Sequence, residues 1–279
     1  MELKREAVSE SIGYLIIFGL ILTGIGLITL YGYPLLMQQQ SSANMRNMEQ
    51  TMIVLQNDLK SLTYKLSNYK ETSLRVSGGS LALYGPLYTP QNFTVQWTNT
   101  TFPGLTNSYV LVPGELRYFS ADDNTVITLE NGAVIEKPLA TNGSFMLADP
   151  RWYLDNSSNQ NTLVINFMNL STEPGTVEQL SETGIGTVRT RLLAASMVLD
   201  TVSQTPGQNT VTITYYPNNN QTIMPDGYAL AWKTYLTNPN NFVGMTWSGT
   251  GQPGAPDTYT IQNIQNIAIK EYDIVVETL

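Results

Sequence analysis

The chain contains no cysteine and no histidine among its 279 residues. Without them it cannot build a Ser-His-Asp triad, a Cys-His pair, a disulfide-stapled domain or a zinc site with nitrogen and sulfur ligands. Charged residues are also scarce at 13%, and the net charge is −8. No cluster of Lys or Arg is present to contact phosphates, so nucleic acid is not an expected partner.

The chemistries that remain depend on carboxylates and glycine-rich loops. Asp and Glu are scattered without a motif for paired-carboxylate catalysis. Asp122-Asp123-Asn124 and Asp155-Asn156 are rich in oxygen but lack the spacing of a calcium loop, and such segments also form turns. Gly78-Gly79 and Gly184-Ile185-Gly186 lack the lysine of a phosphate loop. The sequence therefore predicts a non-catalytic protein without a metal or cofactor.

Residues 12–37 carry no charged side chain. This run is longer than the roughly 20 residues that a helix needs to cross a bilayer. A buried core helix and a secretory signal peptide are the alternatives, but a signal peptide has a shorter apolar region and a small-residue cleavage site. Here the run ends in Pro34 and Leu-Leu-Met instead of small residues, so we expect the segment to remain part of the mature protein. Lys4 and Arg5 precede it and favour a cytoplasmic N-terminus, with the C-terminal part outside.

Apolar residues then recur with alternating spacings of three and four, which is the pattern of a helical a/d seam. We call this set the seam; it comprises Met45, Met48, Met52, Leu55, Leu59, Leu62 and Leu66. Residues 38–70 contain no Gly and no Pro, so the apolar helix is predicted to continue through them. One helix is therefore expected from about residue 10 to residue 69, with a disturbance at Pro34. The seam either packs on the chain's own domain or contacts other subunits. We predict subunit contacts.

Beyond residue 70 the pattern changes to short alternating apolar runs separated by Gly, Pro, Asn and Asp, which is typical of an all-β domain. Asn131-Gly132 within residues 125–136 predicts a hairpin with a type I′ turn. Residues 187–199 fit a strand or a helix. Some 210 residues of this kind suit a sandwich with two sheets. The other expected strands cover residues 73–76, 80–84, 94–97, 109–112, 163–167, 211–215, 229–235 and 267–276.

Six asparagines lie in N-x-S/T triplets, and all of them fall in the β-rich part that we expect outside the membrane. Such triplets also arise by chance in a chain rich in Asn and Thr. They are candidate N-glycosylation sites at Asn92, Asn99, Asn142, Asn156, Asn169 and Asn220.

The N-terminal sequence KREAVSESIG runs from Lys4 to Gly13 directly into the apolar segment. It resembles the class III signal of archaeal type IV pilin-like proteins and archaellins, in which a basic leader precedes an A/V-S-x-x-I-G stretch. The resemblance implies cleavage by a prepilin-type signal peptidase on the cytoplasmic side, and retention of the helix as an anchor and then as a filament core. The cut would fall at Arg5, Glu6, Ala7 or Val8.

Two positions depart from that signal. The usual Ser-Pro-Val-Ile-Gly is Ser-Glu-Ser-Ile-Gly here, and Glu6 precedes Ala7. If the cut follows Arg5, Glu10 becomes the fifth mature residue, and by resemblance it pairs with the N-terminal amine of a neighbouring subunit; alternatively it lies at the cytoplasmic headgroups. The hairpin around residues 130–134 also resembles secreted archaeal pilin-like proteins.

These observations predict an α+β protein in which a long N-terminal helix, transmembrane and then amphipathic, precedes an all-β sandwich-like extracellular domain. The expected parts are a leader at residues 1–9, a membrane or filament-core helix at 10–37, a stalk helix at 38–69 and the β domain at 70–279. Glycines in the apolar helix would allow close helix approach. The expected subunit contacts are Glu10, Gly19, Gly24 and Gly26 together with the seam.

The predicted function is that of a major or minor subunit of an archaeal type IV pilus-like filament for adhesion or surface structure. Its partners would be copies of itself or related subunits, the membrane and the signal peptidase. The alternative is a membrane-anchored binding module that recognises envelope glycans or proteins through exposed aromatic side chains. Its candidate residues are Trp97, Trp152, Trp232 and Trp247, although tryptophans are more often core residues.

Overall fold

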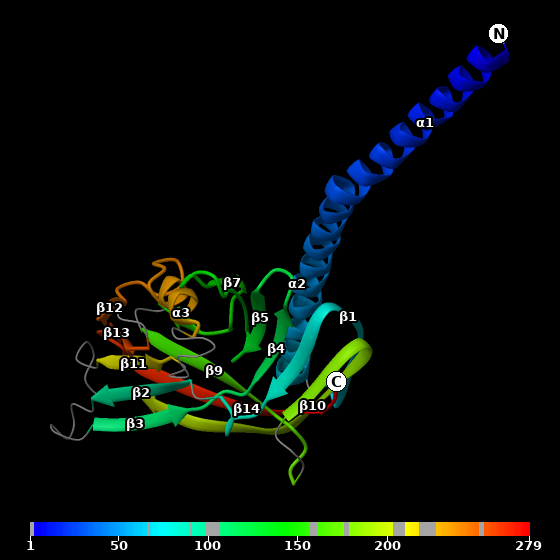
Figure 1. The fold of residues 1–279 in the computed structure, drawn as a ribbon. Helices are drawn as coiled ribbons and strands as arrows, with labels where there is room; N and C mark the ends of the chain where they lie inside the picture. Colours follow the sequence, from blue (N-terminus) through cyan, green and yellow to red (C-terminus); the bar gives the residue numbers. More distant parts are fainter. Residues whose placement is uncertain are drawn as a thin grey trace. The chain divides into compact units, whose positions relative to one another are not determined.

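The computed structural model describes residues 3–65, 67–89, 91–98, 106–156, 161–175, 179–202, 210–217, 227–250 and 254–279. The chain divides into two compact units, Met1–Arg46 and Asn47–Leu279. The first is helical, and the second holds the end of the same long helix together with all the strands (Figure 1). The predicted fold class, a long N-terminal helix followed by a mostly β domain with two sheets, is confirmed.

The helix is interrupted once. Helix α1 covers Leu3–Leu27, a π-helical turn covers Ile28–Gly32, and α2 covers Tyr33–Lys65. In the π turn the Tyr33 N–H donates to the carbonyl of Ile28, five residues back. Pro34 follows at once, and its missing N–H and its ring disfavour a regular α-helical turn before it. The disturbance predicted at Pro34 therefore takes the form of a π turn. The helix ends at Lys65 rather than near residue 69.

Nine strands form the larger sheet in the order β7-β6-β5-β4-β1-β10-β14-β9-β8. All neighbours in it are antiparallel except β14 and β9, which are parallel. Its strands are β1 (Tyr69–Tyr84), β4 (Glu115–Ser120), β5 (Thr125–Glu130), β6 (Ala133–Pro138), β7 (Phe145–Ala148), β8 (Tyr153–Asp155), β9 (Thr162–Ser171), β10 (Gln179–Val202) and β14 (Asn266–Thr278).

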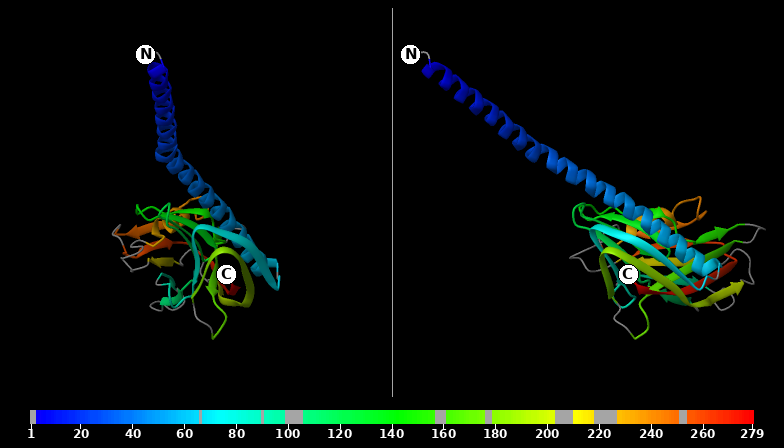
Figure 2. Two further views of the ribbon diagram at one scale, coloured as in Figure 1. Left: turned by 45° about the vertical axis from the view of Figure 1, so that its right-hand side comes forward. Right: turned by 90° about the vertical axis from the view of Figure 1, so that its right-hand side faces the viewer.

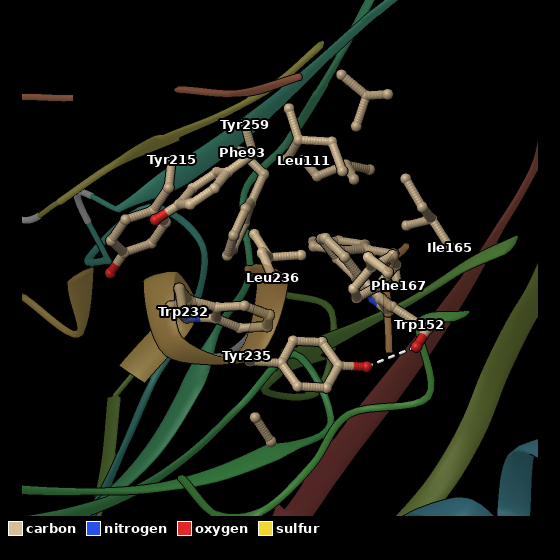
Figure 3. Packing of buried hydrophobic residues seen from close by; sticks show 14 of the residues in the cluster. Phe93, Leu111, Trp152, Ile165, Phe167, Tyr215, Trp232, Tyr235, Leu236 and Tyr259 are labelled. Atoms are coloured by element: carbon tan, nitrogen blue, oxygen red, sulfur yellow. Dashed lines mark hydrogen bonds between the residues drawn. The ribbon is translucent and has the colours of Figure 1, made fainter. Parts of the chain in front are cut away.

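The smaller sheet has five strands in the order β12-β13-β11-β2-β3. They are β2 (Asn92–Thr98), β3 (Thr106–Leu111), β11 (Val211–Tyr216), β12 (Thr246–Gly249) and β13 (Asp257–Ile261). Between the two sheets lies a hydrophobic core, to which helix α3 (Ala229–Leu236) contributes Trp232 and Tyr235 (Figure 3). The indole of Trp232 lies edge-on to Phe93, with ring centroids 4.7 Å apart, and the Tyr235 hydroxyl donates to the carbonyl of Trp152.

Part of the larger sheet, including β5 and β9, is buried on both faces. On β9, Leu163, Ile165 and Phe167 point into the core shared with the smaller sheet, whereas Met168 and Leu170 are buried on the opposite face. The part of α2 from residue 47 onward lies along this opposite face (Figure 2). At β5 a helix on one face and a second sheet on the other leave no solvent-facing side, so every residue of this strand is buried.

Most predicted strands are confirmed, including the hairpin of β5 and β6. Its turn residues Asn131 and Gly132 have positive φ angles of 48° and 74°, as a type I′ turn requires. Residues 187–199 belong to strand β10. The strand predicted at residues 229–235 was wrong, because this segment is α3. Its buried residues fall at helical rather than alternating positions, namely Ala231, Trp232, Tyr235 and Leu236.

Candidate functional site

The uncharged segment of residues 12–37 is the longest exposed apolar run in the described part of the chain. Its large apolar side chains are 46–74% exposed, and no residue of its most apolar 18-residue window is buried. In length and composition this helix is sufficient to cross a membrane. Soluble proteins rarely expose a continuous apolar surface of this size, so the segment requires an apolar environment that the described part of the chain does not provide.

The glycines of this segment stand in open surroundings. A Cβ atom added at Gly19, Gly24 or Gly26 would meet no heavy atom within 4 Å. Larger side chains at these positions would therefore disturb nothing within the described chain. The predicted processing residues Arg5, Glu6, Ala7 and Val8, and Glu10 as well, lie in α1, but their side chains are outside the described ones.

The seam has a different environment from the one we predicted. Its residues Met48, Met52, Leu55, Leu59 and Leu62 are 0–3% exposed within a single chain. They face the outer side of the larger sheet, so the packing is intramolecular, and these five side chains have no surface left for another subunit. The prediction of subunit contacts at these positions is corrected accordingly. Met45 belongs to the first unit, and Leu66 lies outside the described residues.

Polar contacts accompany this packing. The Gln56 side chain is 1% exposed and donates from Nε2 to the carbonyls of Gly132, at 2.6 Å, and Asp149, at 2.9 Å. The Tyr64 ring lies edge-on to Tyr272 of β14, with centroids 5.7 Å apart. The end of α2 is therefore fixed to the turn between β5 and β6 and to β14. A heptad pattern alone does not distinguish this arrangement from a coiled coil, because both bury one stripe of the helix.

Sequence reasoning missed a group of charged residues inside the β domain. Glu115 of β4 lies directly opposite Glu130 of β5, and both are 0% exposed. Arg117 forms an ion pair with Glu115, whose other oxygen accepts hydrogen bonds from the hydroxyls of Tyr228, at 2.7 Å, and Thr128, at 3.1 Å. The alternation of strand side chains brings Glu115, Arg117, Thr128 and Glu130 onto one face. No sequence pattern indicated this group, since isolated glutamates in strands resemble surface residues.

The two carboxyl groups differ in their partners. Glu115 has three, whereas neither oxygen of Glu130 has a hydrogen-bond partner among the described residues. Burial raises the pKa of Glu130 well above its ordinary value, and the charge of Glu115 raises it further; Arg117 and the adjacent Gln91 oppose this. Burial likewise raises the pKa of the Tyr215 and Tyr228 hydroxyls. Because Glu115 and Glu130 are both 0% exposed, neither carboxyl group is accessible to a substrate.

Comparison with known protein families places these features in context. Residues 6–238 match a family of unknown function, DUF7289. The chain belongs to this family. The match includes the apolar helix, the seam and both members of the buried Glu115–Glu130 pair, and it ends after α3. A search of curated proteins gives no match.

The predicted glycosylation sites differ in accessibility. Asn142 and Asn156 are exposed, Asn92 is half-buried at the start of β2, and Asn99 and Asn220 lie outside the described residues. Asn169 lies in β9, where its Nδ2 donates to Asp273 at 3.1 Å. A glycan on Asn169 would be attached to the nitrogen that makes this contact, so the exposed Asn142 and Asn156 are the better acceptors.

The oxygen-rich segments and tryptophans have structural contacts. Asp123 accepts a hydrogen bond from the Ser120 hydroxyl at 3.0 Å, in the turn between β4 and β5. Within the described residues, no three Asp, Glu, His or Cys side chains are grouped to hold a metal ion. Trp152 and Trp232 are in the core, and Trp97 and Trp247 pack against it, the latter beneath the Lys233 ammonium. None of the four tryptophan side chains is exposed, as a surface binding residue would be.

A surface pocket of about 370 Å³ lies among Asn68, Tyr69, Arg189, Arg191 and Glu277. Its arginines are already paired with carboxylates, Arg189 with Glu71 at 2.9 Å and Arg191 with Glu173 at 2.7 Å and Glu277 at 2.9 Å. Two guanidinium groups among three carboxylates leave no excess positive charge for an anion. The exposed helix therefore remains the candidate functional site.

Proposed function

We propose that this protein is a non-catalytic subunit of an archaeal type IV pilus-like surface filament, anchored by its N-terminal helix with the β domain outside the cell. The observation that carries the proposal is the uncharged helix of residues 12–37, whose large apolar side chains are all exposed. Such a surface must be covered by lipid before assembly, and neighbouring helices in a filament would cover it afterwards. The resemblance of residues 4–13 to a class III signal supports the same role.

The family match supports treating the helix as a permanent part of the protein. The matched region starts at Glu6 and continues through the helix into the β domain. A cut among residues 5–8 would preserve nearly all of it. N-terminal sequencing of protein from the source cells tests this directly. A mature N-terminus at residues 6–8 is expected, whereas one beyond residue 37 would identify an ordinary secretory signal and remove the filament proposal.

A second function is favoured by the burial of the seam. Because Met48 to Leu62 are covered by the chain's own sheet, the stalk offers no coiled-coil seam for assembly. A monomeric, membrane-anchored module that binds envelope glycans or proteins would need only the helix of residues 12–37. The two functions differ in whether that helix contacts lipid alone or also other subunits.

Glycine substitutions distinguish the two. Gly19→Leu and Gly24→Leu add bulk where the chain itself has open space and preserve the apolar character that insertion requires. Both variants should remain in the membrane with a folded β domain but lose filaments from sheared surface material. Leu20→Ile, which changes shape rather than bulk at an exposed position, is the matched control. If wild-type cells yield no filaments containing the chain, the anchored module is the better assignment.

A further inference from the structure

Glu130 combines complete burial with a lack of partners. Its side chain is 0% exposed, and both carboxyl oxygens lack a hydrogen bond within the described structure. Its neighbour Gln91 is also fully buried, and neither polar atom of its carboxamide meets the geometry of a hydrogen bond. Buried polar groups are normally satisfied, and an ionised carboxylate is the costliest group to leave unpaired.

Among the described residues, Arg117 is the one cation that lowers the pKa of Glu130. On β4 Glu130 faces Glu115 and Arg117, on β11 Tyr215, and before α3 Tyr228. The Arg117 guanidinium is already bonded to Glu115 and lies 4.7 Å from the ring centroid of Tyr84 on β1. With both carboxylates ionised, two negative charges would share one guanidinium in a site without solvent. One negative charge would remain uncompensated.

We propose that Glu130 holds a proton at neutral pH in the folded β domain, and that this protonated pair makes the domain lose stability as the external pH rises. Glu115 is the ionised member, since it has the arginine and two hydroxyl donors. Glu130 is the neutral member, since a protonated carboxyl avoids the cost of an unpaired buried charge. The pair resembles other carboxylate pairs in which close like charges prevent both groups from ionising together.

The direction of the pH effect follows from linkage. The folded-state pKa of Glu130 is raised above its unfolded value. Between these two values the folded domain holds a proton that the unfolded chain releases, so stability decreases with rising pH. The decrease begins near the unfolded pKa of about 4.3 and ends above the folded pKa. Because the chain has no histidine, few other groups titrate between pH 5 and pH 8.

The test compares the full chain in detergent with its Glu130→Gln variant by urea unfolding of the β domain from pH 5 to pH 8. Glutamine mimics the protonated acid and does not titrate. The unfolding constant of the wild type relative to the variant should rise by up to tenfold per pH unit within the window. Glu71→Gln, at a surface glutamate paired with Arg189, should leave the wild-type pH dependence unchanged. A constant ratio between wild type and Glu130→Gln would overturn the proposal.

Three further measurements apply if the Glu130→Gln variant does not fold, or if a metal cation rather than a proton neutralises the pair. Glu115→Gln leaves Arg117 free to pair with Glu130, so the pH dependence should move to lower pH. In the wild type, infrared difference spectra should show the carbonyl band of a protonated carboxyl at pH 7, and its absence would contradict the proposal. Stabilisation of the wild type, but not of Glu130→Gln, by Na⁺ or Ca²⁺ at constant ionic strength would also overturn it, by showing a bound metal cation.

Discussion

Two regions of the same long helix meet opposite environments. Residues 12–37 are apolar on every side and their large side chains are exposed, whereas residues 47–65 bear a single apolar stripe that is buried against the larger sheet. The two regions differ both in how many apolar residues they contain and in how those residues are arranged around the helix. A helix that is apolar all round can be satisfied only by lipid or by other helices on all sides, while one apolar stripe is satisfied by one sheet face.

The two regions of the helix also have separate roles. In residues 47–65 the side chains of Met52, Leu55, Leu59 and Leu62 complete the β domain, so this part of the helix determines folding. In residues 12–37 no large side chain is buried, so changes there should affect membrane insertion or assembly and leave the β domain intact. Substitutions in the two regions should therefore have separable effects.

Removal of the helix at different points should have the largest effect. A fragment of residues 47–279 retains the helical stripe and should be soluble, folded and cooperative in thermal unfolding. A fragment of residues 70–279 exposes the outer face of the larger sheet. Each buried Leu or Met contributes about 1.5–3 kcal/mol, so losing five of them removes most of the usual 5–15 kcal/mol of domain stability.

Circular dichroism and size-exclusion chromatography measure both fragments. The shorter fragment should aggregate or unfold, although our sequence-based prediction made residues from 70 onward an independent domain. Equal stability of the two fragments would show that the helix contributes little to the β domain, and the assignment of separate roles would fail.

A matched pair of charges on opposite faces of α2 should have the next largest effect. Leu59 is 2% exposed and Val54 is 49% exposed. Leu59→Asp buries an unpaired carboxylate and should destabilise the β domain by about 3–5 kcal/mol, whereas Val54→Asp should change its stability by less than about 0.5 kcal/mol. Urea unfolding measures both. If Val54→Asp abolishes filaments while the domain remains stable, the outward face of α2 contacts other subunits.

The sequence predicted the parts of the fold that depend on local pattern. The uncharged run, the spacing of the seam and the Asn131-Gly132 turn are all readable within a few residues, and each corresponds to an observed helix, buried stripe or hairpin. The short segment at residues 229–235 was misassigned because seven residues are too few to separate a period of two from one of 3.6.

What the seam packs against was not predictable from its spacing. The stripe of Met52, Leu55 and Leu59 suits a partner helix or a sheet equally, and only the topology of the strands supplies the sheet face. The pair of Glu115 and Glu130 is a similar case. The two residues are fifteen positions apart in sequence and become neighbours only through the register of β4 and β5.

The smallest effect is expected for the hydrogen bonds of Gln56, which attach the buried stripe to the β domain. Gln56→Met retains the size of the side chain but removes the donor to the Gly132 carbonyl; Asp149 keeps Lys60 as a second donor at 3.3 Å. An unpaired buried carbonyl costs about 1–3 kcal/mol, which corresponds to a decrease in Tm of about 2–4 °C per kcal/mol for a domain of this size. Gln50→Met, at an exposed position of the same helix, is the control and should leave Tm unchanged. An unchanged Tm for Gln56→Met would mean that apolar burial alone holds the helix on the sheet. A decrease confined to Gln56→Met would show that the polar contact also fixes the position of the helix along it.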